Sequence, residues 1–94
     1  ADAMVVRFGG EEFAILLPRT RLANAFTVAE NVRTTLERVR LKRSRSARAI
    51  EAVTVSIGVA DYRPHESREA LITRCDRALY RAKDLGRNRT VLAD

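Results

Sequence analysis

The sequence predicts a single α+β domain in which two helices pack on one face of a mostly antiparallel sheet. Three observations lead to this prediction. Short segments rich in apolar and β-branched residues are typical of strands. Two longer segments repeat apolar residues every three or four positions, which is typical of amphipathic helices. The segments follow in the order strand–strand–helix–strand–helix–strand, within 94 residues that suit one modest core.

The first two strand segments, residues 4–8 and 13–17, lie on either side of a glycine pair. Gly9 and Gly10 permit the positive φ that a tight hairpin turn requires. The first helix is expected over residues 22–39, whose apolar side chains recur at helical spacing. The basic residues that follow are expected to form a loop or an edge hairpin.

The second half of the chain predicts a strand, a helix and a final strand. Residues 53–60 are β-branched and alternate in polarity, so a third strand is expected there. Ser67 suits the N-cap of the second helix, Gly86 suits its C-terminal cap, and residues 89–92 form the last strand. His65 is expected at the surface. The apolar face of the second helix is expected to consist of Leu71, Ile72, Cys75, Ala78, Leu79, Ala82 and Leu85.

The composition is typical of a soluble folded domain. Hydrophobic residues make up 46% of the chain and charged residues 32%, which argues against disorder. No apolar run approaches the length of about 18 residues that a membrane span needs, and no secretory signal pattern opens the sequence. The single cysteine, Cys75, cannot form an internal disulfide, so a cytoplasmic location is expected.

The net charge of +6 comes from one segment. Residues 38–48 hold six basic side chains and no acidic ones, and the remaining twelve basic side chains balance the twelve acidic ones. Such a run is a solvated surface or a docking surface for a phosphate-bearing partner. A nucleic-acid module is a further reading, but no aromatic residue interleaves the segment to stack on bases, so no nucleic-acid partner is expected.

The turn Gly9-Gly10-Glu11-Glu12 has two interpretations. In the first, the glycines only make the turn and the carboxylates only keep it soluble. In the second, glycines let a phosphate approach backbone N–H groups, and a neighbouring carboxylate holds Mg²⁺ through its oxygens. Because Glu11 and Glu12 are adjacent, their side chains leave a strand in different directions, and one can face a ligand while the other does not.

Three motifs spread over nearly the whole chain bear on this choice. They are RFGGEEF at residues 7–13, VTVSIGVA at 53–60 and DRALYRAKDLGRNR at 76–89. They resemble the signature in its GGEEF form, the central strand, and the last helix with its basic turn in the GGDEF family of diguanylate cyclases. The resemblance implies a palm-like α+β fold, of the nucleotidyl cyclase or ferredoxin-like type, with helices packed on the sheet. The chain would be a partial GGDEF domain, residues 1–94, from which the N-terminal strand–helix portion is absent.

The resemblance also implies an activity and its residues. The family condenses two GTP molecules into cyclic di-GMP with release of pyrophosphate, so the chain would belong to a transferase of bacterial signalling. Glu11 would be catalytic and a ligand of Mg²⁺, with Mn²⁺ as the alternative, and Glu12 would support the catalytic site. Taken alone, two cations near a helix end are typical of solvated surface. By position, the substrate-binding residues would be Gly9, Gly10, Lys83 and Arg87.

The resemblance implies partners as well. Each domain holds one GTP, so a head-to-head homodimer is expected for catalysis, and an upstream sensory domain is expected. The family's other metal-binding aspartate and its guanine-reading residues belong to the absent portion, so the 94 residues alone are expected to make no product. The alternative is a non-catalytic module that binds GTP or cyclic di-GMP as a receptor. No membrane contact is expected of this segment.

The family's inhibitory product site is not matched in this sequence. The aspartate of its RxxD motif would fall at Ala3, and Asp2 is one position away, which turns a strand side chain to the other face. A supporting arginine would fall at Asn31, near Arg33. Product binding in the active-site groove, through Arg87 and the glycine turn, is the alternative.

Overall fold

The computed structural model describes residues 4–9, 12–17, 19–44 and 54–94. Their order confirms the predicted sequence of strands and helices. The elements are β1 (Met4–Gly9), β2 (Glu12–Leu16), α1 (Leu22–Ser44), β3 (Ile57–Val59), α2 (Arg68–Asp84) and β4 (Thr90–Leu92).

The first two strands, β1 and β2, form the antiparallel hairpin that the glycine pair predicts. Arg7 pairs with Phe13, but the register shifts between Arg7 and Gly9, and Gly9 then pairs with Glu12. An irregularity of the β-bulge kind therefore comes directly before the glycine pair. Bulges bend a strand and re-aim its side chains, and they occur often beside active sites.

The last two strands, β3 and β4, pair in parallel, with Ile57 opposite Thr90. The backbone N–H of Ala93 extends this pairing by donating to the carbonyl oxygen of Val59 at 2.7 Å. For this pair the prediction of a mostly antiparallel sheet is wrong. Because α2 connects the two strands, the chain crosses over and returns in the same direction.

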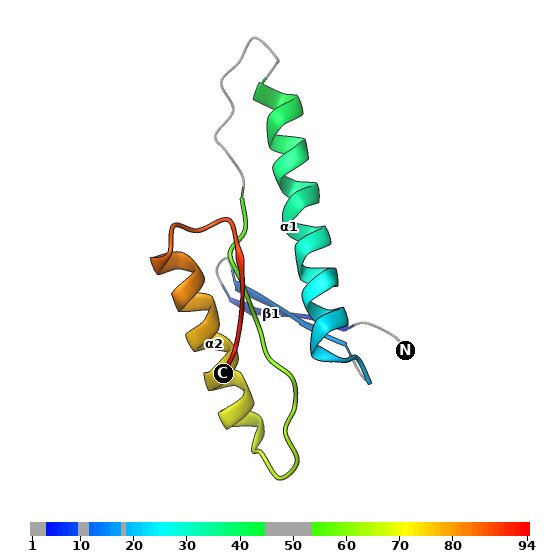
Figure 1. Ribbon diagram of the computed structural model, residues 1–94, viewed down its shortest axis with the longest axis vertical. Helices are drawn as coiled ribbons and strands as arrows, with labels where there is room; N and C mark the ends of the chain where they lie inside the picture. The colour runs from blue at the N-terminus through cyan, green and yellow to red at the C-terminus, as the bar shows by residue number, and fades with distance from the viewer. Residues whose placement is uncertain (1–3, 10–11, 18, 45–53) are drawn as a thin grey trace.

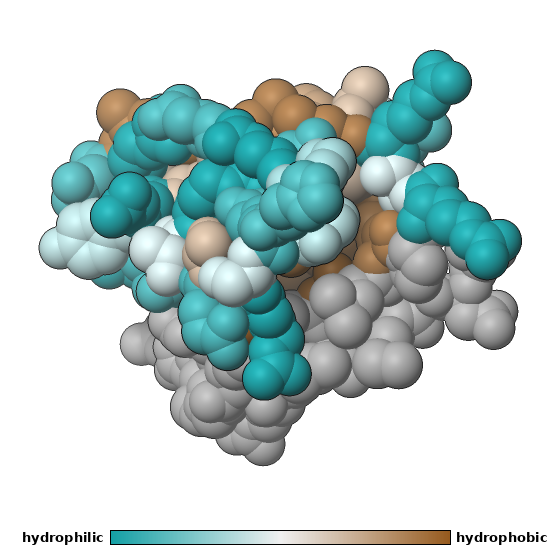
Figure 2. All heavy atoms as spheres, turned by 90° about the horizontal axis from the view of Figure 1, so that it is seen from below, coloured by the Kyte–Doolittle hydropathy of each residue, from teal (hydrophilic) through white to brown (hydrophobic). Residues whose placement is uncertain are grey.

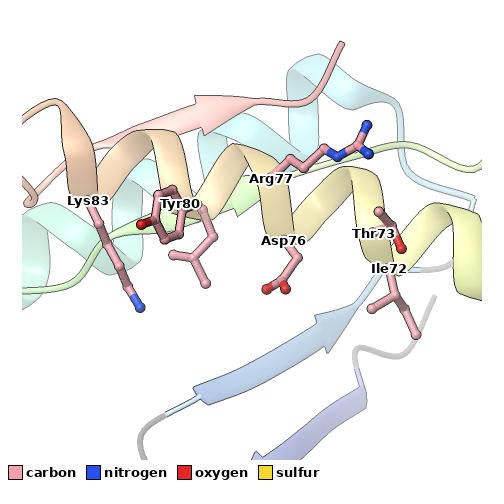
Figure 3. A pocket seen from close by; sticks show the side chains of 7 residues that line it. Ile72, Thr73, Asp76, Arg77, Tyr80 and Lys83 are labelled. Carbon is pink, nitrogen blue, oxygen red and sulfur yellow. The ribbon is translucent and has the colours of Figure 1, made fainter.

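The strand pair β3–β4 runs between the two helices (Figures 1 and 3), and both helices contact both strands. Alternate residues of a strand face opposite ways. Gly58 faces α2, and its neighbour Val59 is buried, so both faces of the pair are covered. The prediction that both helices share one face is therefore wrong for these strands.

Gly58 allows α2 to approach β3 closely. A Cβ atom at this position would lie 2.4 Å from the carbonyl oxygen of Cys75 and 2.4 Å from the backbone nitrogen of Leu79. Ala78 and Ala82, on the predicted apolar face of α2, are fully buried. Small residues on both sides of the contact thus set the distance between helix and strand.

The ends of the elements differ in part from the prediction. Helix α1 continues to Ser44, so the first half of the basic segment is helical rather than a loop or hairpin. Arg, Lys and Leu are good helix formers, and neither Gly nor Pro interrupts them. Of the expected strand 53–60, residue 53 lies outside the described residues, and β3 covers only 57–59 of the rest. At the start of α2 the N-cap prediction is confirmed, because the Ser67 hydroxyl accepts the Ala70 N–H at 3.1 Å.

Several apolar side chains of the described residues remain exposed. Val32 and Val39, expected on the buried face of the first helix, are both exposed, and so are Ile72, Tyr80 and Leu85 on or beside α2. Seen from below, the described residues are mostly hydrophilic, and apolar residues gather in a few groups among them (Figure 2). In the part of the chain that the structure describes, neither helix is long and apolar enough to span a bilayer.

Candidate functional site

The glycine turn lies where β1 ends and β2 begins. Gly9 is the last residue of β1, Glu12 is the first residue of β2, and the two are paired. Gly10 and Glu11 lie outside the described residues, and so does the side chain of Glu12. The roles assigned to these four residues therefore stay predictions.

An open hollow of about 340 Å³ lies along α2. Asp76 and Lys83 point from α2 to the side on which the hairpin lies (Figure 3). The end of the hairpin at which β1 ends and β2 begins lies toward the Lys83 end of this hollow (Figure 3). The described residues that line the hollow are Ile72, Thr73, Asp76, Arg77, Leu79, Tyr80 and Lys83.

The two predicted triphosphate ligands lie on either side of the end of α2. Lys83 is in the last turn of the helix and is exposed, whereas Arg87 follows the helix rather than lying on its face. The reason is the cap: the Gly86 N–H donates to the Lys83 carbonyl at 3.3 Å, and the Arg87 N–H donates to the Ala82 carbonyl at 2.9 Å. This is the Schellman arrangement that a glycine after a helix favours.

Three successive residues after α2 have positive φ. The φ angles are 120° at Gly86, 64° at Arg87 and 46° at Asn88. Glycine adopts this region freely, but other residues do so rarely and need support from their surroundings. The Arg87 side chain is exposed, and within the described ranges its guanidinium makes no hydrogen bond or ion pair. It is therefore available to an anion.

A polar cluster joins this turn to α1. The Arg33 Nη1 donates to the Asn88 backbone oxygen at 3.4 Å and to its Oδ1 at 3.2 Å, and the Asn88 amide donates to the Glu37 carboxylate. The Arg33 Nε donates to Glu30, whose Oε2 also accepts the Thr90 hydroxyl at 3.2 Å. The hydrogen bond from Arg33 lowers the pKa of Glu30, and Glu30 in turn raises the pKa of Arg33.

Sequence reasoning missed this cluster. Glu30, Arg33 and Glu37 were expected only at polar positions of the first helix, with Arg33 also a neighbour of position 31, and Asn88 was expected only as part of a motif. A signal was present, since Glu30, Arg33 and Glu37 are three and four residues apart and so share one face of a helix. Their partners Asn88 and Thr90 lie 51 to 60 residues away in the sequence, so no local pattern indicates these contacts.

Two further residues bear on the sequence predictions. The Cys75 thiol donates to the Gly58 carbonyl oxygen at 3.2 Å, and burial raises the pKa of this thiol, in keeping with a packing role. His65 is exposed, as expected for a surface residue.

The described residues do not supply a metal site on their own. Among residues 4–9, 12–17, 19–44 and 54–94, no three His, Cys, Asp or Glu side chains lie together in a way that could hold an ion. Glu11, the predicted ligand, is outside these ranges. A metal at this turn would therefore depend on Glu11 and on further oxygen ligands beyond the described residues.

Comparison with known proteins places the chain in a family. The family model described as "Diguanylate cyclase, GGDEF domain" matches residues 1–89. Diguanylate cyclase DgcM of Escherichia coli K12 is 47% identical over 90 residues, which are 96% of this chain and 20% of that protein. Diguanylate cyclase VdcA of Vibrio cholerae is 44% identical over 85 residues, which are 90% of this chain and 25% of that protein.

A solved structure has the same fold. The GGDEF domain of DgcB from Caulobacter crescentus, in complex with c-di-GMP, superposes with a TM-score of 0.85 at 38% identity, and the match covers 96% of this chain and 53% of that chain. The chain thus spans a fifth to a quarter of the length of the curated relatives named above, and about half of the solved domain. By the match over residues 1–89, the chain belongs to the GGDEF domain family.

Proposed function

We propose that this chain is part of a diguanylate cyclase domain that condenses two GTP molecules into cyclic di-GMP. The observation that carries the proposal is the position of the β1–β2 hairpin, on the side of α2 toward which Lys83 points (Figure 3); β1 ends at Gly9 and β2 begins at Glu12 of the GGEEF sequence. The family match and the names of the relatives support it. We also propose that the domain is longer than these 94 residues, since they match 53% of the solved GGDEF chain.

In the proposed reaction, the 3′-oxygen of each GTP attacks the α-phosphorus of the other. In each attack the bond between the α-phosphorus and the oxygen that bridges it to the β-phosphorus breaks, one pyrophosphate leaves, and the 3′-hydroxyl gives up its proton to solvent. Lys83 and Arg87 would hold the triphosphate as cations, which binds the substrate. Gly9 and Gly10 would leave room for the phosphates beside the backbone.

Two such domains must face each other, because one domain holds one GTP and the ring contains two nucleotides. The proposed partner is therefore a second copy of the domain, with an upstream sensory domain to bring the copies together. The 94 residues alone would make no product.

The cofactor that we propose is Mg²⁺, with Mn²⁺ as the alternative, held by Glu11 with Glu12 in support. Bound there, the metal would offset phosphate charge and lower the pKa of the attacking hydroxyl.

The test uses the full-length protein with GTP and Mg²⁺, and product is measured by chromatography. Wild type should release cyclic di-GMP and pyrophosphate, and Glu11→Gln should lower turnover by about a thousandfold or more, because a neutral amide is a poor metal ligand. Glu69→Gln is the matched control, since Glu69 is an exposed carboxylate whose one ion pair among the described residues is with exposed Arg68. Turnover by Glu11→Gln at the wild-type rate would overturn the assignment of Glu11.

A receptor is the second candidate function. It is favoured by two similar solved structures that contain the GGDEF domain of DgcB from Caulobacter crescentus, each in complex with c-di-GMP. Calorimetry on the same full-length protein separates the two, since a receptor binds cyclic di-GMP or GTP and releases no pyrophosphate. An Arg87→Ala variant that binds cyclic di-GMP as well as wild type would exclude the groove as the binding place.

A further inference from the structure

We propose that Arg33 of α1 is a positioning residue for Arg87, because it fixes the left-handed turn 86–88 through Asn88. The proposal rests on the proposed function for the role of Arg87, and it adds how this chain places that side chain. None of the predicted ligands lies in α1. In this proposal α1 nevertheless contributes to triphosphate binding, because it positions Arg87.

The backbone of the turn 86–88 has an unusual conformation. Arg87 and Asn88 both have positive φ, and neither is glycine. A backbone of this kind persists only where the surroundings hold it. The helix cap holds one side of the turn, through the hydrogen bond from the Arg87 N–H to the Ala82 carbonyl. The other side needs a separate support.

Arg33 supplies the second support. One nitrogen of its guanidinium binds both the backbone oxygen and the side-chain oxygen of Asn88. The amide of Asn88 is held from its other end by Glu37. A change of φ at Asn88 would move both its backbone oxygen and its side chain away from Arg33, so both hydrogen bonds oppose the change. The side chain of Arg33 is only 18% exposed, so water competes weakly for these bonds.

Arg33 is itself held in place. Its Nε donates to Glu30, and the same glutamate oxygen accepts the hydroxyl of Thr90 in β4. The guanidinium is therefore oriented by α1 and by the strand that follows the turn. The cluster thus joins α1 both to Asn88 in the turn and to Thr90 at the start of β4.

Arg87 lies between the helix cap on one side and the Arg33 contacts with Asn88 on the other. Its backbone is held on both sides, while its exposed guanidinium makes no bond within the described part of the chain. A cation whose backbone is already fixed loses less conformational freedom when it binds an anion. Loss of Arg33 should therefore weaken GTP binding although Arg33 itself does not touch the substrate.

The test measures steady-state kinetics of the full-length protein. Arg33→Met should raise the KM for GTP about tenfold and leave kcat within about twofold, which is the pattern of lost ground-state binding. Arg38→Met is the matched control, because Arg38 is an exposed arginine on the same helix that makes no hydrogen bond or ion pair among the described residues. Equal KM values for the two variants would overturn the proposal.

A double-mutant cycle separates positioning from general damage. If Arg33 acts through Arg87, then Arg33→Met should add nothing to the KM of an Arg87→Ala protein. If the two increases multiply, Arg33 acts independently of Arg87 and the proposal fails. Asn88→Ala serves as the second variant should Arg33→Met not fold, because alanine lacks both side-chain contacts and adopts a positive φ only at a cost in free energy. Its KM should rise in the same way, and an unchanged KM counts against the proposal.

A readout without turnover keeps this inference distinct from the proposed function. The Cα chemical shifts and the HN–Hα couplings of Arg87 and Asn88, in selectively labelled protein, report their φ angles. Left-handed values should be present in wild type and in Arg38→Met, and absent in Arg33→Met. If wild type makes no cyclic di-GMP, the proposed function fails while this measurement still decides whether Arg33 holds the turn. Unchanged φ angles in Arg33→Met would overturn the inference.

Discussion

Arg33 and Arg74 make similar contacts in two regions of the molecule. Each donates its Nε to a glutamate, Arg33 to Glu30 and Arg74 to Glu66 at 2.6 Å. Each also binds a backbone carbonyl distant in sequence, and their side chains are 18% and 14% exposed. Chemistry alone therefore does not distinguish the two clusters.

What the two arginines join is different. Arg74 binds the Asp61 carbonyl at 2.6 Å, the Glu66 carboxylate, and the carbonyl of Asp94 at 3.2 Å. All of these belong to the β3–α2–β4 unit and its flanks. Arg33 instead ties α1 to the turn after α2. The Arg74 contacts therefore stabilise the β3–α2–β4 unit itself. The Arg33 contacts instead fix the position of the turn after α2 relative to α1.

The largest expected effect comes from a change that disturbs both clusters. Gly58→Ala places a Cβ 2.4 Å from backbone atoms of α2. Backbone atoms, unlike the end of a flexible side chain, cannot rotate out of the way. The helix must move from β3, and overpacking of this kind should cost about 3 kcal/mol of stability. Urea denaturation of the full-length protein measures the loss. A variant with wild-type stability would mean that the helix and strand pack less closely than described.

The next prediction separates the two arginines. Arg74→Met should lower the thermal midpoint, because it leaves the shielded Glu66 carboxylate without its partner. It should leave the KM for GTP unchanged, whereas Arg33→Met raises it. Arg68→Met is the control, since its pair with Glu69 is exposed and should be worth less than about 1 kcal/mol. If both Arg33→Met and Arg74→Met raised KM equally, the distinction between the clusters would be lost.

The pH dependence of stability sharpens the same comparison. The hydrogen bond from Arg74 lowers the pKa of Glu66 from its ordinary value of 4.5 to about 2. Because the folded-state pKa is the lower one, this stabilisation is complete above pH 4.5 and is lost as the pH falls toward about 2. Thermal midpoints of wild type should fall through this range more steeply than those of Glu66→Gln. Parallel curves would contradict the pairing.

The features that the sequence predicted correctly are those with local causes. The hairpin at Gly9, the N-cap at Ser67 and the positive φ of Gly86 each depend on residues within one turn or one helix end. The family motifs placed Lys83 at the end of the last helix in the same way. Such signals need no knowledge of which elements pack together.

The features that failed depend on tertiary packing. The parallel pairing of β3 with β4 and the placement of the helices on two faces follow from how α2 crosses over, which no local pattern records. Gly58 looked like an ordinary strand residue because its partner atoms lie on α2. The contact of Arg33 with Asn88 joins residues 55 positions apart. In the glycine turn, Gly10 and Glu11 lie outside the described residues, so their roles stay predictions.

The smallest expected effect tests whether stability and positioning are separate. Ser67→Ala removes the oxygen that accepts the Ala70 N–H and should cost about 1 kcal/mol. Ser67→Asp keeps an acceptor at the N-cap and should retain most of the stability. Because Ser67 lies at the end of α2 remote from Arg87, its loss should leave the KM for GTP unchanged, as Arg74→Met does. A raised KM in Ser67→Ala would mean that any destabilisation of α2 disturbs the turn 86–88. The effect of Arg33→Met on KM would then not show that Arg33 positions Arg87.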